Sequence, residues 1–368
     1  MNRKRLPFVG IVAFGLVSAA HAQAPAETTP PVDLASSPGA TWETIAPESV
    51  SFSSVYLEAL TTFLKAHHTT SMVVAVHGKI TYQYGDTSKV SVIASVRKSV
   101  LSMLYGNYVQ SGKIDTQKTV KQIGLDDKQP FLPIEENSKL AYLLAGRSGI
   151  LIVPEKPDPS SADSYQPKRG TELPGNFFTY NEWDFNAAGT AFEKLTGKDI
   201  YDALETDLAR AIGMQDFDRA RQKKNSNLPF SVHPQYPMYL STRDMARLGQ
   251  LMLRQGNWNG KQVMPADWVR YTTTLWTPFQ DMHPGFRANM PDPTAGGSAS
   301  CGSSGTNRVT STTPGPGPCR APSSRWGRAV STSPCCRGTT WSSRTKSIST
   351  LRAARSIPSN GTQSSIWF

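Results

Sequence analysis

The chain has 368 residues and a formal net charge of +11, and its length is enough to bury a sizeable core. The charge is concentrated at the ends: nine Arg or Lys and no Asp or Glu lie beyond residue 292, and three basic residues lie within the first five. Subtracting these twelve charges from +11 leaves −1 for the body, which excludes the basic face of a nucleic-acid-binding protein. All four cysteines also lie beyond residue 292, and the six histidines form no metal-spaced pair. We therefore expect no disulfide in the body and no metal site.

The N-terminal residues have the pattern of an export signal. Three basic residues precede an apolar run from Leu6 to Ala20, which closes on Ala20-His21-Ala22. A short apolar run with small residues at a cleavage site is typical of secretory signal peptides, and it is too short to span a membrane. We expect residues 1–22 to be cleaved and the mature protein to be periplasmic or secreted, without a membrane span; the alternative is a buried N-terminal strand. Residues 23–50, rich in Pro, Ala, Ser and Thr, predict a linker.

The next elements predicted are a helix, a β-hairpin and a second helix. Apolar residues recur at helical spacing between Tyr56 and Leu64. Residues 72–76 and 80–84 are β-rich and flank a turn at Gly78, which predicts a hairpin. A further helical pattern runs from Ser95 to Gly112. This order brings a sheet edge close to the N-terminus of a helix.

The middle of the chain is predicted to be helix and loop. Helical patterns occupy residues 140–144, 185–195, 200–212 and 244–253, and another begins at Pro265. Ser241 and Thr242 can cap the fourth of these helices. A loop rich in Pro, Asp and Ser spans residues 154–174.

The periodic patterns end near residue 292. More than half of the residues beyond it are Ser, Thr, Pro or Gly, and neither a helical nor a strand period is found. One interpretation is a natural low-complexity tail. The other is a reading frame shifted by one nucleotide, since the genetic code permits β-rich runs when residues 298–304 and 329–346 are read in a shifted frame. We favour the frameshift because the composition changes abruptly, so that residues 51–292 form an incomplete domain and residues 293–368 an aberrant, disordered tail.

Ser95-Val96-Arg97-Lys98 is a Ser-x-x-Lys motif at the start of a predicted helix. Residues three apart share a helix face, which brings the lysine amine toward the serine hydroxyl. A lysine in a partly dry cleft loses proton affinity and can act as a base. The motif is weak alone, since about one chance match is expected in a chain of this length; Ser343-Arg344-Thr345-Lys346 is such a match. By itself it favours a solvated helix start over a catalytic pair.

The surrounding sequence resembles the superfamily of class C β-lactamases and penicillin-binding proteins over about residues 50–275. The block Tyr180–Gly189 is especially similar to the branch that includes 6-aminohexanoate-dimer hydrolases and related esterases. The resemblance implies an α+β, β-lactamase-like fold, in which an antiparallel sheet is flanked by helices and a helical subdomain lies between its second and third strands. The two last blocks named below resemble later helices of that family. The blocks that carry the resemblance are Ala94–Ser99, Leu143–Ile150, Pro174–Asn181, Leu240–Gly249 and Trp258–Lys261.

The resemblance also implies a serine-hydrolase mechanism. Ser95 would attack a carbonyl carbon and become acylated, Lys98 would take the serine proton, and Tyr180 would relay a proton to the leaving group and help water to deacylate the enzyme. The backbone N–H of Ser95 would supply half of an oxyanion hole. The alternative for Tyr180 is an aromatic ring packed under a loop.

Three residues beside this tyrosine are candidate substrate-binding residues: Asn181, Glu182 and Trp183. The family's Tyr-x-Asn motif appears as Tyr180-Asn181-Glu182, with a carboxylate where an amide usually contacts substrate. If Glu182 faces the site, its charge should disfavour acidic substrates such as β-lactams; it can equally point to solvent. Trp183 and Phe177 suggest an apolar side of an acyl pocket, or else belong to the core.

The family's third element, a Lys-Thr-Gly or His-x-Gly strand that completes the oxyanion hole, has no in-frame counterpart and would fall within residues 293–368. The expected function is hydrolysis of a small ester or linear amide through an acyl-serine, without a cofactor. One rival is a β-lactamase or D,D-peptidase acting on β-lactams or cell-wall peptides. The other is an inactive, truncated product. The sequence does not indicate an oligomeric state.

Overall fold

The computed structural model describes residues 37–153, 167–226, 229–274, 276–278, 282–284 and, for the backbone alone, 365–367. The chain divides into two compact units, residues 1–31 and 32–368, and every described residue belongs to the second. The predicted signal peptide, the first half of the predicted linker and most of the predicted loop at 154–174 lie outside the described residues. The predicted aberrant tail also lies outside them, apart from residues 365–367.

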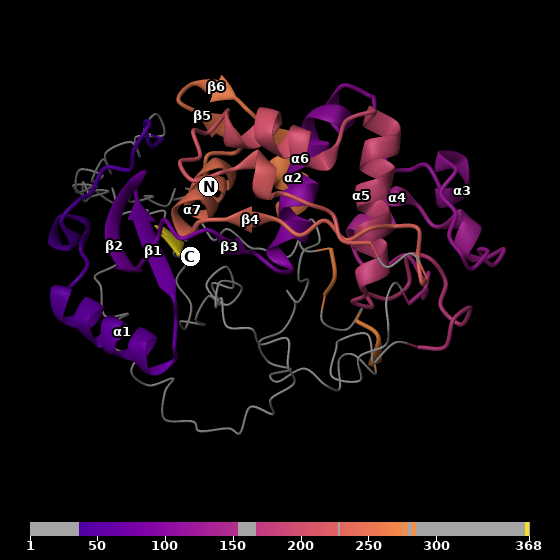
Figure 1. The fold of residues 1–368 in the computed structure, drawn as a ribbon, viewed down its shortest axis with the longest axis horizontal. Helices are drawn as coiled ribbons and strands as arrows, with labels where there is room; N and C mark the ends of the chain where they lie inside the picture. The colour runs from indigo at the N-terminus through magenta and orange to yellow at the C-terminus, as the bar shows by residue number, and fades with distance from the viewer. Residues whose placement is uncertain are drawn as a thin grey trace, which may run out of the picture. The chain divides into compact units, whose positions relative to one another are not determined.

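A β-hairpin begins the main sheet (Figure 1). β1 (Ser71–Val76) and β2 (Lys79–Gly85) pair antiparallel, as predicted. The two turn residues, His77 and Gly78, have φ angles of 52° and 75°. Positive φ at both central positions gives the turn whose twist matches that of the flanking strands, and glycine adopts it without steric cost.

The third strand of this sheet, β7 (Ser365–Trp367), pairs antiparallel with Val74–Val76, so the strand order is β2-β1-β7 (Figure 1). Residues 293–368 are predicted to contain no regular element. Among the few of them that the structure describes, residues 365–367 form this strand. The helices from α2 to α8 lie between β2 and β7 along the chain, which is the order that an α+β fold of this kind requires.

Helices and the N-terminal segment contact the hairpin. α1 (Ser54–Ala66), predicted from its periodicity, contacts β2 where Thr61 Oγ1 lies 2.8 Å from Tyr82 Oη. Part of the predicted linker is instead docked on the sheet, and this corrects its boundary. Thr44 forms a β-bridge with Ile80 of β2, and residues 47–50 form the 3₁₀ turn η1. The Trp42 indole N–H donates to the backbone carbonyl of Arg243.

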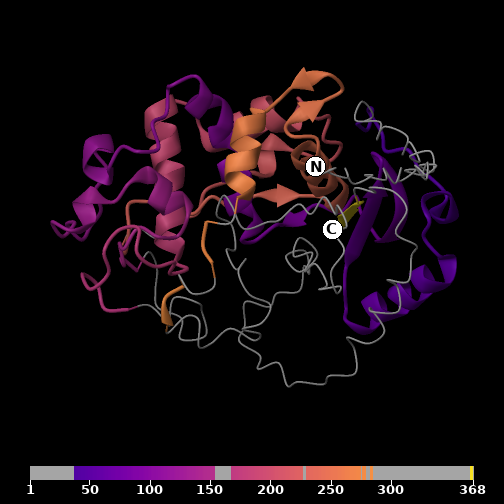
Figure 2. The same cartoon turned by 180° about the vertical axis from the view of Figure 1, so that it is seen from behind.

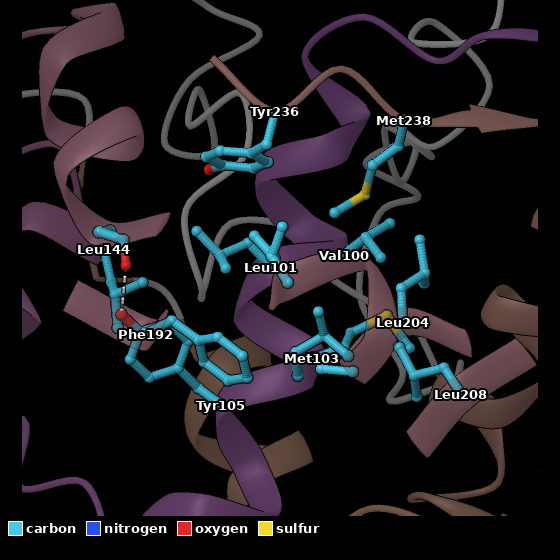
Figure 3. Close-up of a cluster of buried hydrophobic side chains, with 14 of the residues drawn as sticks. Val100, Leu101, Met103, Tyr105, Leu144, Phe192, Leu204, Leu208, Tyr236 and Met238 are labelled. Atoms are coloured by element: carbon cyan, nitrogen blue, oxygen red, sulfur yellow. Dashed lines mark hydrogen bonds between the residues drawn. The ribbon is translucent and has the colours of Figure 1, made fainter. Parts of the chain in front are cut away.

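α2 (Val96–Gln110) is the central helix of the remaining part, and it contacts α5, α8 and η4 (Figures 1 and 2). Nine of its fifteen residues are buried, as expected of a helix enclosed on most sides. Figure 3 shows its apolar residues among those of neighbouring elements, with the Tyr105 hydroxyl donating to the Ala188 carbonyl. This core fixes the base of the helix whose first turn carries Ser95 and Lys98.

Most predicted helices are confirmed, with one change of type: residues 204–209 continue the predicted helix at 200–212 as a π-helix, where Arg210 N donates five residues back to Glu205 O. The periodicity of six residues cannot distinguish the two helix types. The other elements are α3 (Val120–Ile123), η2 (Glu135–Asn137), α4 (Leu140–Leu144), α5 (Glu182–Thr196), α6 (Ile200–Ala203), η4 (Leu204–Ala209), η5 (Arg219–Arg221), α7 (Thr242–Leu253) and α8 (Ala266–Thr273).

The expectation of a helix at Trp258–Lys261 is wrong. β5 (Asn257–Trp258) and β6 (Lys261–Gln262) form a two-stranded hairpin there. The turn residues Asn259 and Gly260 have φ angles of 49° and 84°, and Asn-Gly is the strongest short hairpin signal. The local turn chemistry therefore prevails over the family resemblance at this position.

Candidate active site

Ser95 stands at the turn between a short strand and the central helix. β3 (Ser91–Val92) pairs with β4 (Tyr239–Leu240), and two residues later Ala94 has a φ of 44°, in the left-handed region that non-glycine residues rarely adopt. Ser95 is the N-cap residue of α2, but its side chain makes no capping hydrogen bond. The turn therefore leaves the Ser95 hydroxyl available to groups outside the helix.

Lys98 lies one helical turn after Ser95 and is only 1% exposed. Its Nζ lies 3.3 Å from Ser95 Oγ and 2.5 Å from Glu182 Oε1, and it also donates to the Tyr180 hydroxyl. These three oxygens match the three donors of an ammonium group. Nζ also lies 5.1 Å from the centre of the Phe185 ring. The contact with a carboxylate stabilises the charged form of this lysine.

Tyr180, from the segment before α5, completes the polar cluster. Its hydroxyl oxygen lies 2.8 Å from Ser95 Oγ and 3.0 Å from Glu182 Oε1. A carboxylate only accepts hydrogen bonds and an ammonium only donates them. A neutral Tyr180 therefore donates to Glu182 and accepts from Lys98, which leaves Ser95 to donate its hydroxyl hydrogen to Tyr180. The serine proton thus points at the phenol oxygen.

Glu182 lies between two cations. Its Oε1 is 2.5 Å from Lys98 Nζ, and its Oε2 is 2.7 Å from Arg97 Nη2. Burial would raise the pKa of Glu182, but the charges of Lys98 and Arg97 and the hydrogen bonds from Lys98 and Tyr180 outweigh burial and lower the pKa to about 2. Glu182 is therefore ionised at neutral pH. Its side chain is 19% exposed and faces the cluster, which decides between the two orientations that the sequence leaves open.

The expectation that Glu182 gives the site a negative charge is wrong, because two cations compensate its carboxylate. Arg97 and Lys98, 5% and 1% exposed, both pair with it. With Tyr180 neutral, these three side chains sum to a charge of +1. Charge repulsion by Glu182 is therefore no argument against acidic substrates.

Two of the candidate substrate-binding residues support the site from within the protein. Asn181, 2% exposed, caps α5: its Oδ1 accepts from the backbone N–H of Asp184 at 2.7 Å. Trp183 is fully buried, and its indole N–H donates to Asp127 Oδ2 at 2.6 Å. Because their polar atoms are used internally and neither side chain is accessible, we correct their assignment from substrate binding to structural support.

Phe177, the other residue expected to line an apolar pocket, is half-buried, and its ring meets the His283 ring edge-on at 6.0 Å between centres.

No group of three His, Cys, Asp or Glu side chains suited to a metal ion occurs among the described residues. Within the same residues, no helix is long and apolar enough to cross a membrane.

Sequence reasoning missed Arg97, although it lies inside the Ser-x-x-Lys motif. Its Nη2 donates to Glu182 and also to Asn186 Oδ1 at 3.1 Å, and its guanidinium carbon lies 4.2 Å from the centre of the Tyr236 ring. Glu182 and Arg97 are 85 residues apart in the chain. Both helices carry other charged residues as well, so the sequence does not single out this pair, and the pairing depends on how α2 packs against α5.

Comparison with known families identifies the fold. A family model described as Beta-lactamase matches residues 58–312, more than half of the chain. Among curated proteins, an uncharacterized protein of Alkalihalophilus pseudofirmus is 25% identical over 202 residues, which are 52% of this chain and 57% of that protein. The chain thus spans little more than half the length of this relative.

Two solved structures are similar to this chain at lower identity. One is named as a 6-aminohexanoate-dimer hydrolase from Bacillus anthracis, with 19% identity, a TM-score of 0.46 and coverage of 58% of this chain and 61% of that one. Another is the octameric penicillin-binding protein homologue from Pyrococcus abyssi, with 14% identity, a TM-score of 0.45 and coverage of 61% of each chain.

Proposed function

Because the chain belongs to the β-lactamase family of serine hydrolases, we propose that it cleaves an ester or a linear amide through an acyl-serine at Ser95. The observation that carries the proposal is the triangle formed by Ser95 Oγ, Lys98 Nζ and the Tyr180 hydroxyl, in which Oγ lies 2.8 Å from the phenol oxygen and 3.3 Å from the amine. A nucleophile within hydrogen-bond reach of a base, with a third group orienting the base, is the arrangement that acyl transfer needs.

In acylation, Ser95 Oγ forms a bond to the substrate's carbonyl carbon while its proton passes to the oxygen of Tyr180 in its phenolate form. The carbonyl π electrons move to oxygen, and the backbone N–H of Ser95 would donate to that oxyanion. When the C–O or C–N bond to the leaving group breaks, the leaving group takes the proton from Tyr180. The products of this step are a free alcohol or amine and an ester on Ser95.

Deacylation repeats these steps with water. A water oxygen adds to the acyl carbon and gives its proton to Tyr180, and Ser95 Oγ then departs with that proton. The carboxylic acid is released and the enzyme returns to its starting state. No group other than those of the chain and water is consumed.

This proposal assigns Lys98 a different part from the one that sequence reasoning gave it. Its Nζ lies nearer to Glu182 Oε1, at 2.5 Å, than to Ser95 Oγ, at 3.3 Å. An ammonium paired with a carboxylate has no lone pair to accept a proton. We therefore propose that Tyr180 receives the serine proton and that Lys98 stabilises the phenolate.

The chemistry of Glu182 supports esters and simple amides over penicillin-like substrates. A carboxylate accepts hydrogen bonds but cannot donate one, so the donor that an asparagine would offer to a substrate amide carbonyl is lost here. Both Glu182 oxygens are already engaged by Lys98 and Arg97. Substrates without an acylamino side chain lose least from this change. If residues 1–22 are a signal peptide, hydrolysis takes place outside the cytoplasm.

The test is a parallel assay with a p-nitrophenyl ester and the β-lactam nitrocefin, using the purified chain and its Ser95→Ala variant. We expect ester hydrolysis that Ser95→Ala abolishes, with nitrocefin turned over at least tenfold more slowly. Faster nitrocefin turnover would support the β-lactamase alternative. Absence of both activities in the native chain would support an inactive product and contradict the proposal.

A further inference from the structure

Arg97 is buried behind the candidate site and held on three sides. Its Nη2 donates to Glu182 Oε2 at 2.7 Å and to Asn186 Oδ1 at 3.1 Å. The guanidinium carbon lies 4.2 Å from the centre of the Tyr236 ring. Because a guanidinium is planar and always charged, these contacts fix both the place and the orientation of a positive charge.

This arrangement determines which carboxylate oxygen faces the reacting groups. With Oε2 bonded to Arg97, the other oxygen of Glu182 is turned toward Lys98 Nζ and the Tyr180 hydroxyl, at 2.5 and 3.0 Å. Without Arg97, the carboxylate would face a single ammonium, and its second oxygen would be buried without its cation. The cost of such an unbalanced buried charge is large.

We propose that Arg97 is a positioning residue of the hydrolytic site, whose charge and bond to Glu182 Oε2 balance the carboxylate so that Tyr180 can ionise beside Lys98. This inference rests on the proposed function, because it matters for hydrolysis only if Tyr180 accepts the Ser95 proton. The proton leaves the Tyr180 oxygen for solvent when the phenolate forms. It is replaced by the Ser95 proton during acylation.

The charges in the cluster give the sign of each expected effect. When Tyr180 is ionised, two cations, Arg97 and Lys98, face two anions, Glu182 and Tyr180. Replacing Arg97 by glutamine leaves one cation against two anions, which disfavours the phenolate, and replacing Glu182 by glutamine favours it. Changing both Arg97 and Glu182 leaves one cation, Lys98, and one anion, the Tyr180 phenolate, so the charges balance again.

Among the described residues, two further titratable groups interact electrostatically with Arg97: Tyr201, whose pKa burial raises and which therefore stays neutral, and Tyr236. Tyr236 lies under the Arg97 guanidinium, and burial raises the pKa of Tyr236. Its hydroxyl donates to the Phe185 carbonyl at 2.9 Å. Tyr236 therefore stays neutral over the range in which the cluster works and does not change the charge count.

The direct test measures the ionisation of Tyr180 as a function of pH by NMR of 13Cζ-labelled tyrosine. The Tyr180 signal is assigned by its loss in Tyr180→Phe. We expect the midpoint of the Tyr180 titration to rise by about one pH unit in Arg97→Gln, to fall by a similar amount in Glu182→Gln, and to return near the native value in the double variant. Equal midpoints in the native chain and Arg97→Gln would overturn the proposal.

The chain offers a matched control in Arg247. This arginine is also fully buried and faces an aromatic ring, Trp258, but it donates to backbone carbonyls such as that of Ile212. Arg247→Gln should destabilise the fold and leave the Tyr180 midpoint unchanged. An equal shift in Arg247→Gln would reduce the effect of Arg97 to general loosening of the structure.

Two further measurements keep the test decisive: the Tyr180 titration in a conservative variant and the pH dependence of hydrolysis. If Arg97→Gln does not fold, Arg97→Lys keeps the charge and should leave the midpoint within a few tenths of a pH unit, while Glu182→Gln still lowers it; failure of either result rejects the inference. The second is the acidic limb of kcat/KM for the p-nitrophenyl ester, which should move with the midpoint. A chain that hydrolyses no ester rejects the proposed function, and the NMR titration still judges Arg97.

Discussion

At the scale of single residues, the site consists of a serine hydroxyl beside a cluster of paired charged side chains. Ser95 and Tyr180 form the reacting pair, while Lys98 and Arg97 hold the carboxylate of Glu182 from its two sides. Buried ion pairs of this kind cost desolvation energy, and their value lies in fixing geometry and protonation states. Stability and activity are therefore linked through one carboxylate.

The lowered pKa of Glu182 predicts a pH dependence of stability. Its pKa falls from 4.5 to about 2 on folding, so its ionised form stabilises the protein above pH 4.5, and this contribution is lost as the pH falls toward 2. We expect the native free energy of unfolding to drop by up to about 3 kcal/mol over this window from Glu182 alone. Urea unfolding at several pH values checks it: Glu182→Gln should show a smaller drop, and the exposed Glu58→Gln the full one. Equal drops for the native chain and Glu182→Gln would contradict the prediction.

Which site residues could be predicted follows from how local their signals are. The pair Ser95 and Lys98 lies within one helical turn, so spacing alone brings them together. The family resemblance added Tyr180 across the fold. Glu182 was a candidate from its place in the family motif, but its pairing with Arg97 escaped because a buried ion pair between residues 85 apart leaves no local pattern in the sequence.

At the scale of elements, the first turn of α5 supports the cluster. The helix begins at Glu182, three residues before the predicted start, because Asn181 and not a later residue supplies the cap. Helix starts depend on one side-chain hydrogen bond, whereas the helix body depends on a repeated apolar pattern. Periodicity therefore located the body of α5 and missed its beginning.

The cap predicts the effect of replacing Asn181. Its Oδ1 accepts from Asp184 N at 2.7 Å. Asn181→Ala should lower the free energy of unfolding by about 1 kcal/mol and leave KM for the ester unchanged, whereas Asn181→Ser should retain most of the stability. Thermal unfolding and steady-state kinetics check both points. A several-fold rise in KM with no loss of stability would restore Asn181 as a substrate-binding residue.

A glycine in α5 lets another element approach the site. A Cβ placed on Gly189 would lie 2.6 Å from Tyr236 Cε1, and Tyr236 is the ring beneath Arg97. Glycine to alanine in a helix normally stabilises by about 1 kcal/mol. Here Gly189→Ala should instead destabilise by about 1–3 kcal/mol through overpacking, while Thr62→Ala on the exposed face of α1 should change stability by less than about 0.5 kcal/mol. A raised melting temperature for Gly189→Ala would show that the ring moves aside freely.

At the scale of the whole molecule, the main sheet joins strands that lie far apart in the sequence. β1 pairs with β2 along its length and with β7 at three residues only. A sheet needs three or more paired strands to be stable, and the unpaired N–H and C=O groups of an exposed edge strand can pair with another chain. Helical periodicity made the helical part predictable, whereas the third strand of the sheet, β7, lies at residues 365–367, in a segment whose sequence has no strand period.

The frameshift interpretation predicts the outcome of restoring the reading frame. A compensating one-base change near codons 290–300 should open a long β-rich frame, and the chain it encodes should melt at a higher temperature and hydrolyse the ester faster than the present one. Nucleotide sequencing and expression of both chains check this. A nucleotide sequence without such a frame would identify residues 293–368 as a natural tail.

The central claim, that Ser95 becomes acylated, is tested most directly by treating the purified chain with a fluorophosphonate and mapping the adduct by peptide mass spectrometry. Attack by the serine oxygen forms an O–P bond and expels fluoride. We predict one phosphonylated residue, Ser95, with labelling slowed at least a hundredfold in Tyr180→Phe and absent in Ser95→Ala. A folded chain that takes up no phosphonate, or that carries it on another residue when Ser95 is intact, would contradict the account.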